Sequence, residues 1–303
     1  MNWFNDQYNC LIPFRSEKME AIISHDIDIP YFFGKIRSVL SRAKARQTAD
    51  GFKGAIAHLL EYTKVRAGLS QDRYATFDYI MQTQAQRNIK STWFILLCSD
   101  NLWGLDLNKY AKQLKRITAA GHEIALHPGY DSYLSPEKRR AEKEAIEQLA
   151  GCTITGARNH FLRFKIPESY HMTHDTGLIY DSTLGFAEHE GFRSGFCSPF
   201  KPFDPLRREP VEILEIPMSI MDGTFRDYQN ISPEQAEIRI KAMIDHVADI
   251  HGTIVFNWHN TFLLAEESGW RKTYENSLDY LIEKEAVFST AAELSQKWCE
   301  RWQ

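Results

Sequence analysis

Short runs of apolar and β-branched residues alternate along the chain with longer segments of mixed polarity. Such short runs are typical of strands that are buried in a sheet. The clearest runs cover residues 21–24, 91–97, 123–126 and 253–258. Polar residues that can bind a metal or carry a proton follow the first, third and last of these runs: Asp26, His127 and His259.

Helical patterns lie between these predicted strands. Ser135 and Ser232 are each followed by Pro and Glu, which is the signature of a helix N-terminus with a capping serine and an acidic first turn. The first of these helices is expected to run to about Leu149, and the second is expected to end near Gly252. A third helical pattern covers about residues 272–284.

Alternation of strands and helices over a long chain predicts an α/β fold with a parallel sheet. Functional sites of such folds form at the carboxyl ends of the strands, and a barrel brings several of these ends to one mouth. Three predicted strands are followed by residues that can bind a metal or carry a proton, so we predict a barrel-like arrangement. Residues 1–303 are interpreted as a single domain.

Residues 31–75 form a long, helical connection between the first two predicted strands, and we interpret them as an insertion. Its stretch from Tyr31 to Ala67 carries eight basic residues and two acidic ones. The simpler interpretation, which we favour, is a solvated helical face. The alternative is a patch that contacts an anionic head group, either of a diphosphate-linked sugar or of a membrane surface.

The bulk composition narrows the class of protein. The net charge of −4 gives no reason to expect a nucleic-acid partner. The five cysteines are odd in number and widely spaced, so they indicate neither a disulfide framework nor a thiolate zinc site. Residues 1–7 contain no basic start and no apolar core of a signal peptide, and no apolar run is long enough for a membrane span. We therefore expect a cytoplasmic protein.

Asp26 and Asp28 are the first candidates for catalysis. Positions i and i+2 of an extended strand point to the same side, so both carboxylates are expected to face one space. Two unpaired carboxylates would repel each other there, and a divalent cation would relieve that repulsion. The alternative is a simple turn, because Asp favours turns and Pro30 follows closely.

His127 ends a predicted strand, and an acid, Asp131, follows four residues later. If the chain turns helically after Pro128, the two side chains share a face and could hold one ion. Asp131 could equally be a turn or capping residue before the next helix. His259 has a side chain suited to general acid catalysis, and Arg158 could hold a catalytic aspartate by a bidentate contact. Their simpler interpretations are a buried histidine and a surface ion pair.

Taken together and in order, these motifs resemble those of the polysaccharide deacetylases, the family-four carbohydrate esterases. The resemblance rests on five segments and extends from about Ile22 to Thr290: Asp26-Ile27-Asp28, Ser91-Thr92-Trp93-Phe94, residues 121–128, the segment from Arg158 to Phe161, and residues 257–260. It implies a distorted (β/α) barrel, usually of seven strands. It also implies a metal-dependent hydrolase that acts on a linear amide bond.

The resemblance also suggests roles for individual residues. Asp26 resembles the general base, His259 the catalytic acid, and Arg158 the residue that orients the base. The backbone N–H of Phe161 resembles the donor to the oxyanion. The implied metal ligands are Asp28 and His127, with Asp131 at the position where the family usually has a second histidine.

Three further residues are expected to contact the substrate. Asp181 lies in a segment that resembles the family motif lining the pocket, and Trp258 precedes the expected acid. Arg193 lies in a loop rich in glycine and aromatic residues, which could instead be a packed irregular loop.

The resemblance implies removal of an N-acetyl group from an amino sugar, in surface polysaccharide or O-antigen precursor assembly. The expected cofactor is a divalent metal ion, zinc first and otherwise cobalt, nickel, iron or manganese. The expected substrate is a sugar, free or linked to a nucleotide or lipid. The alternatives are a hydrolase of a non-sugar amide on the same scaffold and a catalytically silent sugar-binding protein.

Overall fold

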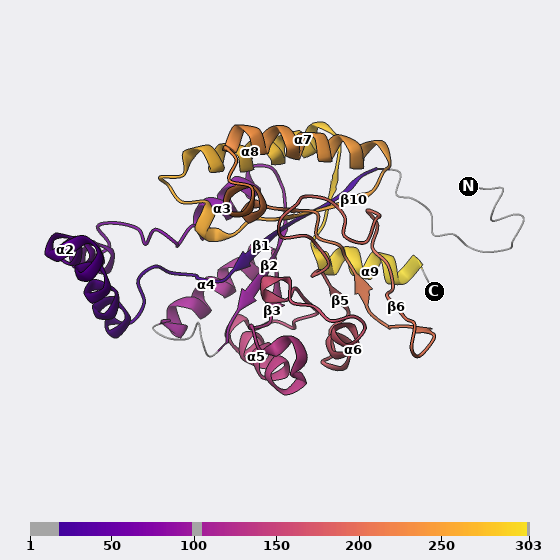
Figure 1. Cartoon of the computed structure of the whole chain (residues 1–303), viewed down its shortest axis with the longest axis horizontal. Helices are drawn as coiled ribbons and strands as arrows, with labels where there is room; N and C mark the ends of the chain where they lie inside the picture. The colour runs from indigo at the N-terminus through magenta and orange to yellow at the C-terminus, as the bar shows by residue number, and fades with distance from the viewer. Residues whose placement is uncertain (1–17, 99–104, 302–303) are drawn as a thin grey trace, which may run out of the picture.

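The computed structural model describes residues 18–98 and 105–301, and it consists of a parallel sheet surrounded by helices (Figure 1). The sheet curls into a half-barrel with the strand order β8-β5-β4-β3-β2-β1-β10-β9, and β11 pairs with the start of β1. Its strands are β1 (Glu20–Ile27), β2 (Ser91–Leu96), β3 (Glu123–His127), β4 (Gly156–Ala157), β5 (Tyr180–Asp181), β8 (Leu214–Glu215), β9 (Ile220–Met221), β10 (Thr253–Asn257) and β11 (Val287–Phe288). The predicted distorted (β/α) barrel is therefore confirmed.

The strand count differs from the seven that the resemblance implies. Nine strands form the sheet within the described residues, and β4, β5, β8, β9 and β11 have only two residues each. Segments that short carry no periodicity, so the sequence did not predict them. A separate antiparallel pair consists of β6 (Phe203–Asp204) and β7 (Glu209–Pro210).

The side chains of β1 alternate between two buried clusters. Ala21 and Ile23 pack into the larger cluster, under the surrounding helices, whereas Ile22 packs into a smaller one. The smaller cluster lines the inner face of the sheet and also contains Leu294 and Trp298 of the last helix. Because this alternation has a period of two, Ser24, Asp26 and Asp28 continue on the same inner side as Ile22. The strand pattern thus directs both aspartates into the barrel.

The surrounding helices are α3 (Phe77–Ala85), α4 (Leu107–Ala119), α5 (Pro136–Ala150), α6 (Glu168–Asp175), α7 (Pro233–Asp249), α8 (Ser268–Glu283) and α9 (Ala291–Arg301). The predicted helices correspond to α5, α7 and α8. Ser135 caps α5 by accepting a hydrogen bond from the Lys138 N–H, and Ser232 forms a capping box with Gln235 at the start of α7. Short turns of 3₁₀ or π-helix cover Ser132–Leu134, His160–Leu162, Thr224–Tyr228 and Asn260–Phe262.

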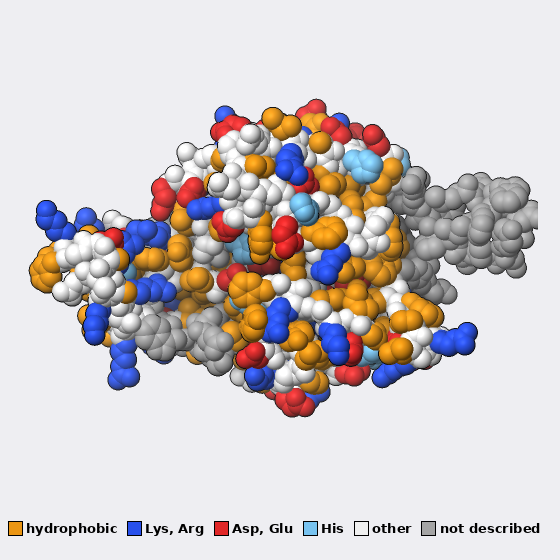
Figure 2. Space-filling view, viewed as in Figure 1, with side chains coloured by type: hydrophobic (Ala, Val, Ile, Leu, Met, Phe, Trp, Pro, Cys, Tyr) orange, Lys and Arg blue, Asp and Glu red, His pale blue; other side chains and the backbone are white. Residues whose placement is uncertain are grey.

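The predicted helical insertion after the first strand is confirmed as α2 (Ile36–Arg66), which stands away from the barrel at the left of Figure 1. Gly51 interrupts it with a φ of 72°, a left-handed conformation that glycine adopts without strain, so α2 consists of two helical halves. Lys and Arg side chains gather on this part of the surface (Figure 2). Asp72 anchors the base of the insertion by accepting hydrogen bonds from the N–H groups of Phe32 and Phe33, both at 2.8 Å.

Two other sequence predictions concern membrane-spanning segments and disulfides. Within the described residues, no helix is both long enough and apolar enough to cross a membrane. No disulfide joins the four cysteines of the described part of the chain. Cys10 and the N-terminal segment lie outside the described residues. The single-domain interpretation of residues 1–303 stays a prediction.

Candidate metal and catalytic centre

A cluster of polar side chains lies at the carboxyl ends of β1, β3 and β10 and in the turn after β4. The alternation that directs Asp26 and Asp28 inward also applies to His127, which follows Ala125 by two positions, and to Asn257, which follows Val255. Strand pairing aligns Ser24 with Asn257, so the ends of β1 and β10 are neighbours. Side chains predicted from separate motifs therefore meet at one end of the barrel.

Asp26 is buried and held on both carboxylate oxygens. Its Oδ1 accepts a hydrogen bond from Arg158 at 2.9 Å, and its Oδ2 accepts one from the Asn257 amide at 2.7 Å. Burial by itself raises the pKa of Asp26, but the positive charge of Arg158 and then that of His127 outweigh it and hold the pKa below its ordinary value. Asp26 is thus a deprotonated carboxylate in a fixed orientation.

Arg158 is fully buried and makes more contacts than the predicted one with Asp26. Its guanidinium also donates to Ser24 Oγ at 2.8 Å and to the Ser182 carbonyl oxygen at 3.0 Å, and it stacks over the Phe94 ring at 4.2 Å. The alternative of a surface ion pair is therefore wrong for this residue, since its partners lie inside the barrel. A buried pair of this kind is stable only when its other hydrogen bonds are also satisfied.

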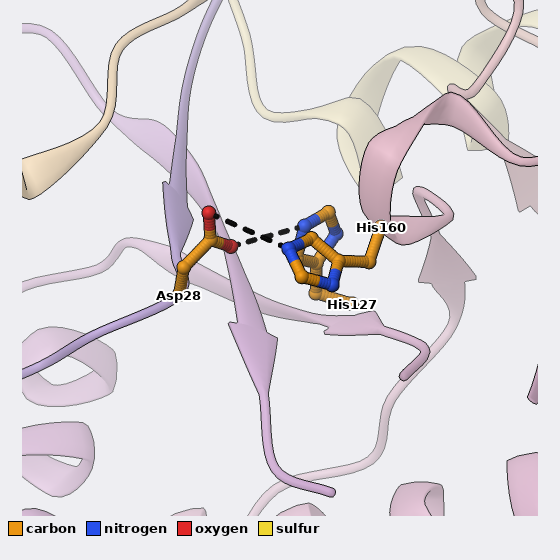
Figure 3. Close-up of side chains that lie close together, drawn as sticks. All are labelled: Asp28, His127 and His160. Carbon is orange, nitrogen blue, oxygen red and sulfur yellow. Dashed lines mark ion pairs between the residues drawn. The ribbon is translucent and has the colours of Figure 1, made fainter. Parts of the chain in front are cut away.

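Asp28, His127 and His160 form a group that could hold a metal ion (Figure 3). One ligand atom from each residue lies within 4.8 Å of the others. His127 Nε2 is 3.2 Å from Asp28 Oδ1, and His160 Nε2 is 3.7 Å from Asp28 Oδ2. Figure 3 shows the two imidazoles pointing toward the carboxylate from the same side.

The chemistry of this donor set fits a divalent transition metal. His127 Nδ1 donates a hydrogen bond to the Arg158 carbonyl oxygen at 2.5 Å, so Nδ1 keeps its proton, and Nε2, which lies 3.2 Å from Asp28 Oδ1, is the nitrogen available to a metal ion. Two imidazole nitrogens and one carboxylate oxygen are ligands that zinc accepts, and catalytic zinc sites commonly have three protein ligands. The three residues present can therefore hold such an ion.

The third member of this group differs from the predicted one. The side chain of Asp131 is 68% exposed, and its carboxylate lies 3.9 Å from Lys138 Nζ rather than beside His127. The i and i+4 relation would have required a helix after Pro128, whereas His127 is still in the extended strand β3 and Asp131 directly precedes the 3₁₀ turn Ser132–Leu134. His160, from the turn after β4, lies where Asp131 was expected. The sequence signal was a histidine two residues after Arg158.

His259 also lies close to Asp28, with its Nε2 3.8 Å from Asp28 Oδ2. Its Nδ1 donates to Asp222 Oδ1 at 2.6 Å, and its backbone N–H donates to Asp222 Oδ2 at the same distance. Burial alone lowers the pKa of His259, but the Asp222 carboxylate more than compensates and raises it to about 10. Sequence reasoning missed Asp222; its signal was an acid directly after the apolar residues of β9.

Phe161 lies on the 3₁₀ turn with His160 and has a φ of 57°, and its side chain is 68% exposed. The three predicted substrate contacts are not among the residues that line the cavity beside Asp26 and Asp28. Asp181 is buried and accepts a hydrogen bond from the Thr183 N–H at 2.8 Å. Trp258 is buried against Tyr274, and Arg193 donates to the Gly185 carbonyl oxygen at 3.4 Å. Their contact with a substrate stays a prediction.

Two cavities meet at the cluster. The smaller, of about 220 Å³, is lined by Asp26, Asp28, His127, His160 and His259 together with neighbouring residues. The larger, of about 540 Å³, shares Asp28, His160 and Phe161 with it and extends toward α2. The carboxylate of Asp26 and the imidazole of His259 thus face a space large enough for a small chemical group, and three residues line both this space and the larger cavity.

Solved structures of known proteins share this fold over most of its length. A Mycobacterium smegmatis structure assigned as a polysaccharide deacetylase has a TM-score of 0.61 at 16% identity, covering 94% of this chain and 92% of that chain. The Puue allantoinase has a TM-score of 0.62 at 14% identity, covering 92% and 90%. A Pseudomonas aeruginosa PAO1 structure assigned as a polysaccharide deacetylase has a TM-score of 0.59 at 14% identity, also covering 92% and 90%.

No family model and no curated protein matches the sequence. The resemblance in the motifs and the likeness in three dimensions nevertheless agree on the architecture. The chain has the fold of the polysaccharide deacetylases.

Proposed function

We propose that this protein is a metal-dependent hydrolase that removes an N-acetyl group from an amino sugar. The observation that carries the proposal is the meeting, in one cavity, of a clamped carboxylate, a three-residue metal group and a histidine paired with a buried aspartate. A base, an electrophile and an acid are the elements that amide hydrolysis requires.

Asp28, His127 and His160 are the proposed ligands of the ion, with zinc first and cobalt, nickel, iron or manganese as alternatives. A divalent ion bound there would polarise the amide carbonyl and lower the pKa of a water molecule. His127 is prepared for this role because the Arg158 carbonyl oxygen holds its ring in one tautomer.

Asp26 is the proposed general base. Its lowered pKa keeps it ionised at neutral pH, and the hydrogen bonds from Arg158 and Asn257 prevent it from rotating away from the cavity. The carboxylate then takes a proton from the attacking water. Arg158 acts as a positioning residue, since it holds the base and does not itself line the cavity.

His259 is the proposed general acid. Its raised pKa keeps the imidazole protonated at neutral pH, and Asp222 fixes Nδ1 so that Nε2 faces the cavity. The proton on Nε2 is donated to the departing amine. The backbone N–H of Phe161, on the turn that also carries His160, is the proposed donor to the carbonyl oxygen as negative charge develops there.

The sugar substrate is supported by the motif resemblance and by the two structural neighbours assigned as polysaccharide deacetylases. We propose a cytoplasmic enzyme that acts on a nucleotide- or lipid-linked precursor in surface polysaccharide or O-antigen assembly. The allantoinase among the structural neighbours supports a second candidate, the hydrolysis of a non-sugar amide on the same scaffold.

A substrate screen tests both candidates. The protein, loaded separately with zinc, cobalt and manganese, is incubated with N-acetylglucosamine oligomers, a nucleotide-linked N-acetyl sugar and allantoin. Release of acetate together with a free amine from a sugar is the expected result. Turnover of allantoin alone would favour the non-sugar hydrolase, and absence of both bound metal and turnover would favour a silent sugar-binding protein.

A further inference from the structure

The larger cavity lies between the barrel and the helical insertion, and the proposed chemistry uses only one edge of it. Its barrel side includes Leu96 and the turn residues His160 and Phe161, while Ser38 and Arg42 of α2 line the side of the insertion. At about 540 Å³ it is the size of a ligand pocket and far larger than an acetyl group requires.

Apolar side chains exposed to the solvent surround this cavity. Ile29, Tyr130 and Phe161 are 43%, 49% and 68% exposed, although large apolar side chains are usually buried. The rings of Tyr130 and Phe161 contact each other edge to face, with 5.9 Å between their centroids. Apolar residues that gather at a concave site, rather than singly, indicate a surface that binds an apolar group.

One cation faces this apolar space. Arg42 donates a hydrogen bond to the Phe32 carbonyl oxygen, and its guanidinium lies 5.2 Å from the centre of the Phe32 ring. Within residues 18–98 and 105–301, no carboxylate lies within salt-bridge distance of Arg42. A guanidinium has five N–H donors, so Arg42 is held in place with donors left to bind an anion.

We propose that this cavity binds a part of the substrate that carries an aromatic or branched aliphatic group together with a phosphate or carboxylate. The apolar group packs against Tyr130 and Leu96, and Arg42 binds the anion. Because the cavity shares Asp28, His160 and Phe161 with the smaller one, the scissile amide of the same molecule reaches the proposed catalytic groups. This inference rests on the proposed function for its link to turnover, but its binding step is independent of it.

Binding of 1-naphthyl phosphate to the metal-loaded full-length protein, measured by calorimetry, tests the inference. Inorganic phosphate and 1-naphthol are the comparison ligands, since each has only half of the proposed chemistry. We expect 1-naphthyl phosphate to bind about tenfold more tightly than either. Equal affinity for 1-naphthyl phosphate and inorganic phosphate would overturn the proposal, since it would assign all binding to the anion alone.

Variants separate the two contacts. Arg42→Gln is expected to lower the affinity for 1-naphthyl phosphate about tenfold and to leave the affinity for 1-naphthol unchanged. Arg42→Lys should restore part of the lost affinity. The matched control is Arg46→Gln, one turn further along α2 and outside the cavity, which should have no effect. Tyr130→Ala should weaken both aromatic ligands. Equal effects of the Arg42 and Arg46 variants would contradict a specific site.

Turnover distinguishes failure of this inference from failure of the proposed function. On an N-acetyl substrate with an apolar phosphate-bearing substituent, Arg42→Gln should raise KM and leave kcat unchanged. Specific binding without turnover of any amide would keep the cavity site and reject the hydrolase. Turnover with no dependence of KM on Arg42 would keep the hydrolase and reject the cavity as part of its substrate site.

Discussion

The charged residues at the barrel ends are buried and bonded to distant parts of the chain, whereas those of the helical insertion are mostly exposed. At the barrel ends Asp26, Arg158 and Asp222 are buried, and each forms at least two hydrogen bonds with residues from distant parts of the chain. On α2 the basic residues are mostly exposed, and the ion pair between Arg46 and Asp50 is local, four residues apart. The barrel therefore fixes orientation, whereas the insertion supplies a charged and apolar wall.

The energy of ion pairs differs between the two regions in the same way. Breaking a buried pair leaves an uncompensated charge in a low dielectric and costs about 3–5 kcal/mol, while an exposed pair contributes about 0–1 kcal/mol. Substitutions at the barrel ends should thus affect both chemistry and stability. Substitutions on the insertion should affect only what the wall binds.

The largest expected effect is the loss of turnover caused by Asp26→Asn. The amide cannot accept the proton, so kcat should fall by about 10²–10⁴ while most of the metal stays bound, because the proposed ligands are unchanged. Turnover and metal content of the same preparation are the measurements. The substitution leaves the Arg158 charge without its partner and could unfold the protein, so circular dichroism is the control that the variant is folded. Wild-type turnover in a folded Asp26→Asn protein would show that Asp26 is not the base.

The metal group comes next. His160→Ala and His127→Ala each remove one of the three proposed ligands and should lower metal affinity by at least about 100-fold, whereas Asp131→Ala should retain the metal. Elemental analysis after dialysis measures the occupancy. The reverse result, with metal lost from Asp131→Ala and kept by His160→Ala, would restore the sequence-based ligand set.

Asp222→Asn should have a smaller effect that depends on pH. The Asp222 carboxylate raises the pKa of His259 against the lowering effect of burial. A general acid works only while protonated, so activity is lost as pH rises through this pKa, and a lower pKa moves that loss to lower pH. We expect about a tenfold decrease in kcat/KM at mildly alkaline pH and a lesser one at acidic pH. An unchanged pH profile would argue against His259 as the acid.

The smallest expected effects are those on the free energy of unfolding. Arg158→Lys keeps the charge but loses the forked contacts to Ser24, Asp26 and Ser182, so it should destabilise the fold by about 1–3 kcal/mol. Arg46→Lys on α2 should change the free energy of unfolding by less than about 0.5 kcal/mol. Urea denaturation of both variants measures the difference. Similar values for the two would mean that the barrel end is no more rigidly held than the insertion.

Strand-end chemistry was predictable because it depends on local pattern. His25 and Asp26 are adjacent in sequence but point to opposite faces of β1: His25 Nδ1 contacts the Trp258 carbonyl oxygen at 3.0 Å among core aromatic residues, while Asp26 faces the cavity. A period of two decides this in any buried strand. The capping serines of α5 and α7 were predictable for the same reason, since their partners lie three residues away.

The chain's own pattern of residues determined that Asp26, Asp28, His127 and His259 lie at strand ends, and that a basic helical insertion follows β1. Only the tertiary structure decided that His160, and not Asp131, lies beside Asp28 and His127, that Asp222 orients His259, and that a cavity lies between α2 and the barrel. The physical reason is distance along the chain. Two-residue strands and irregular turns bring these groups together, and such segments have neither the periodicity nor the local partners from which their positions could be predicted.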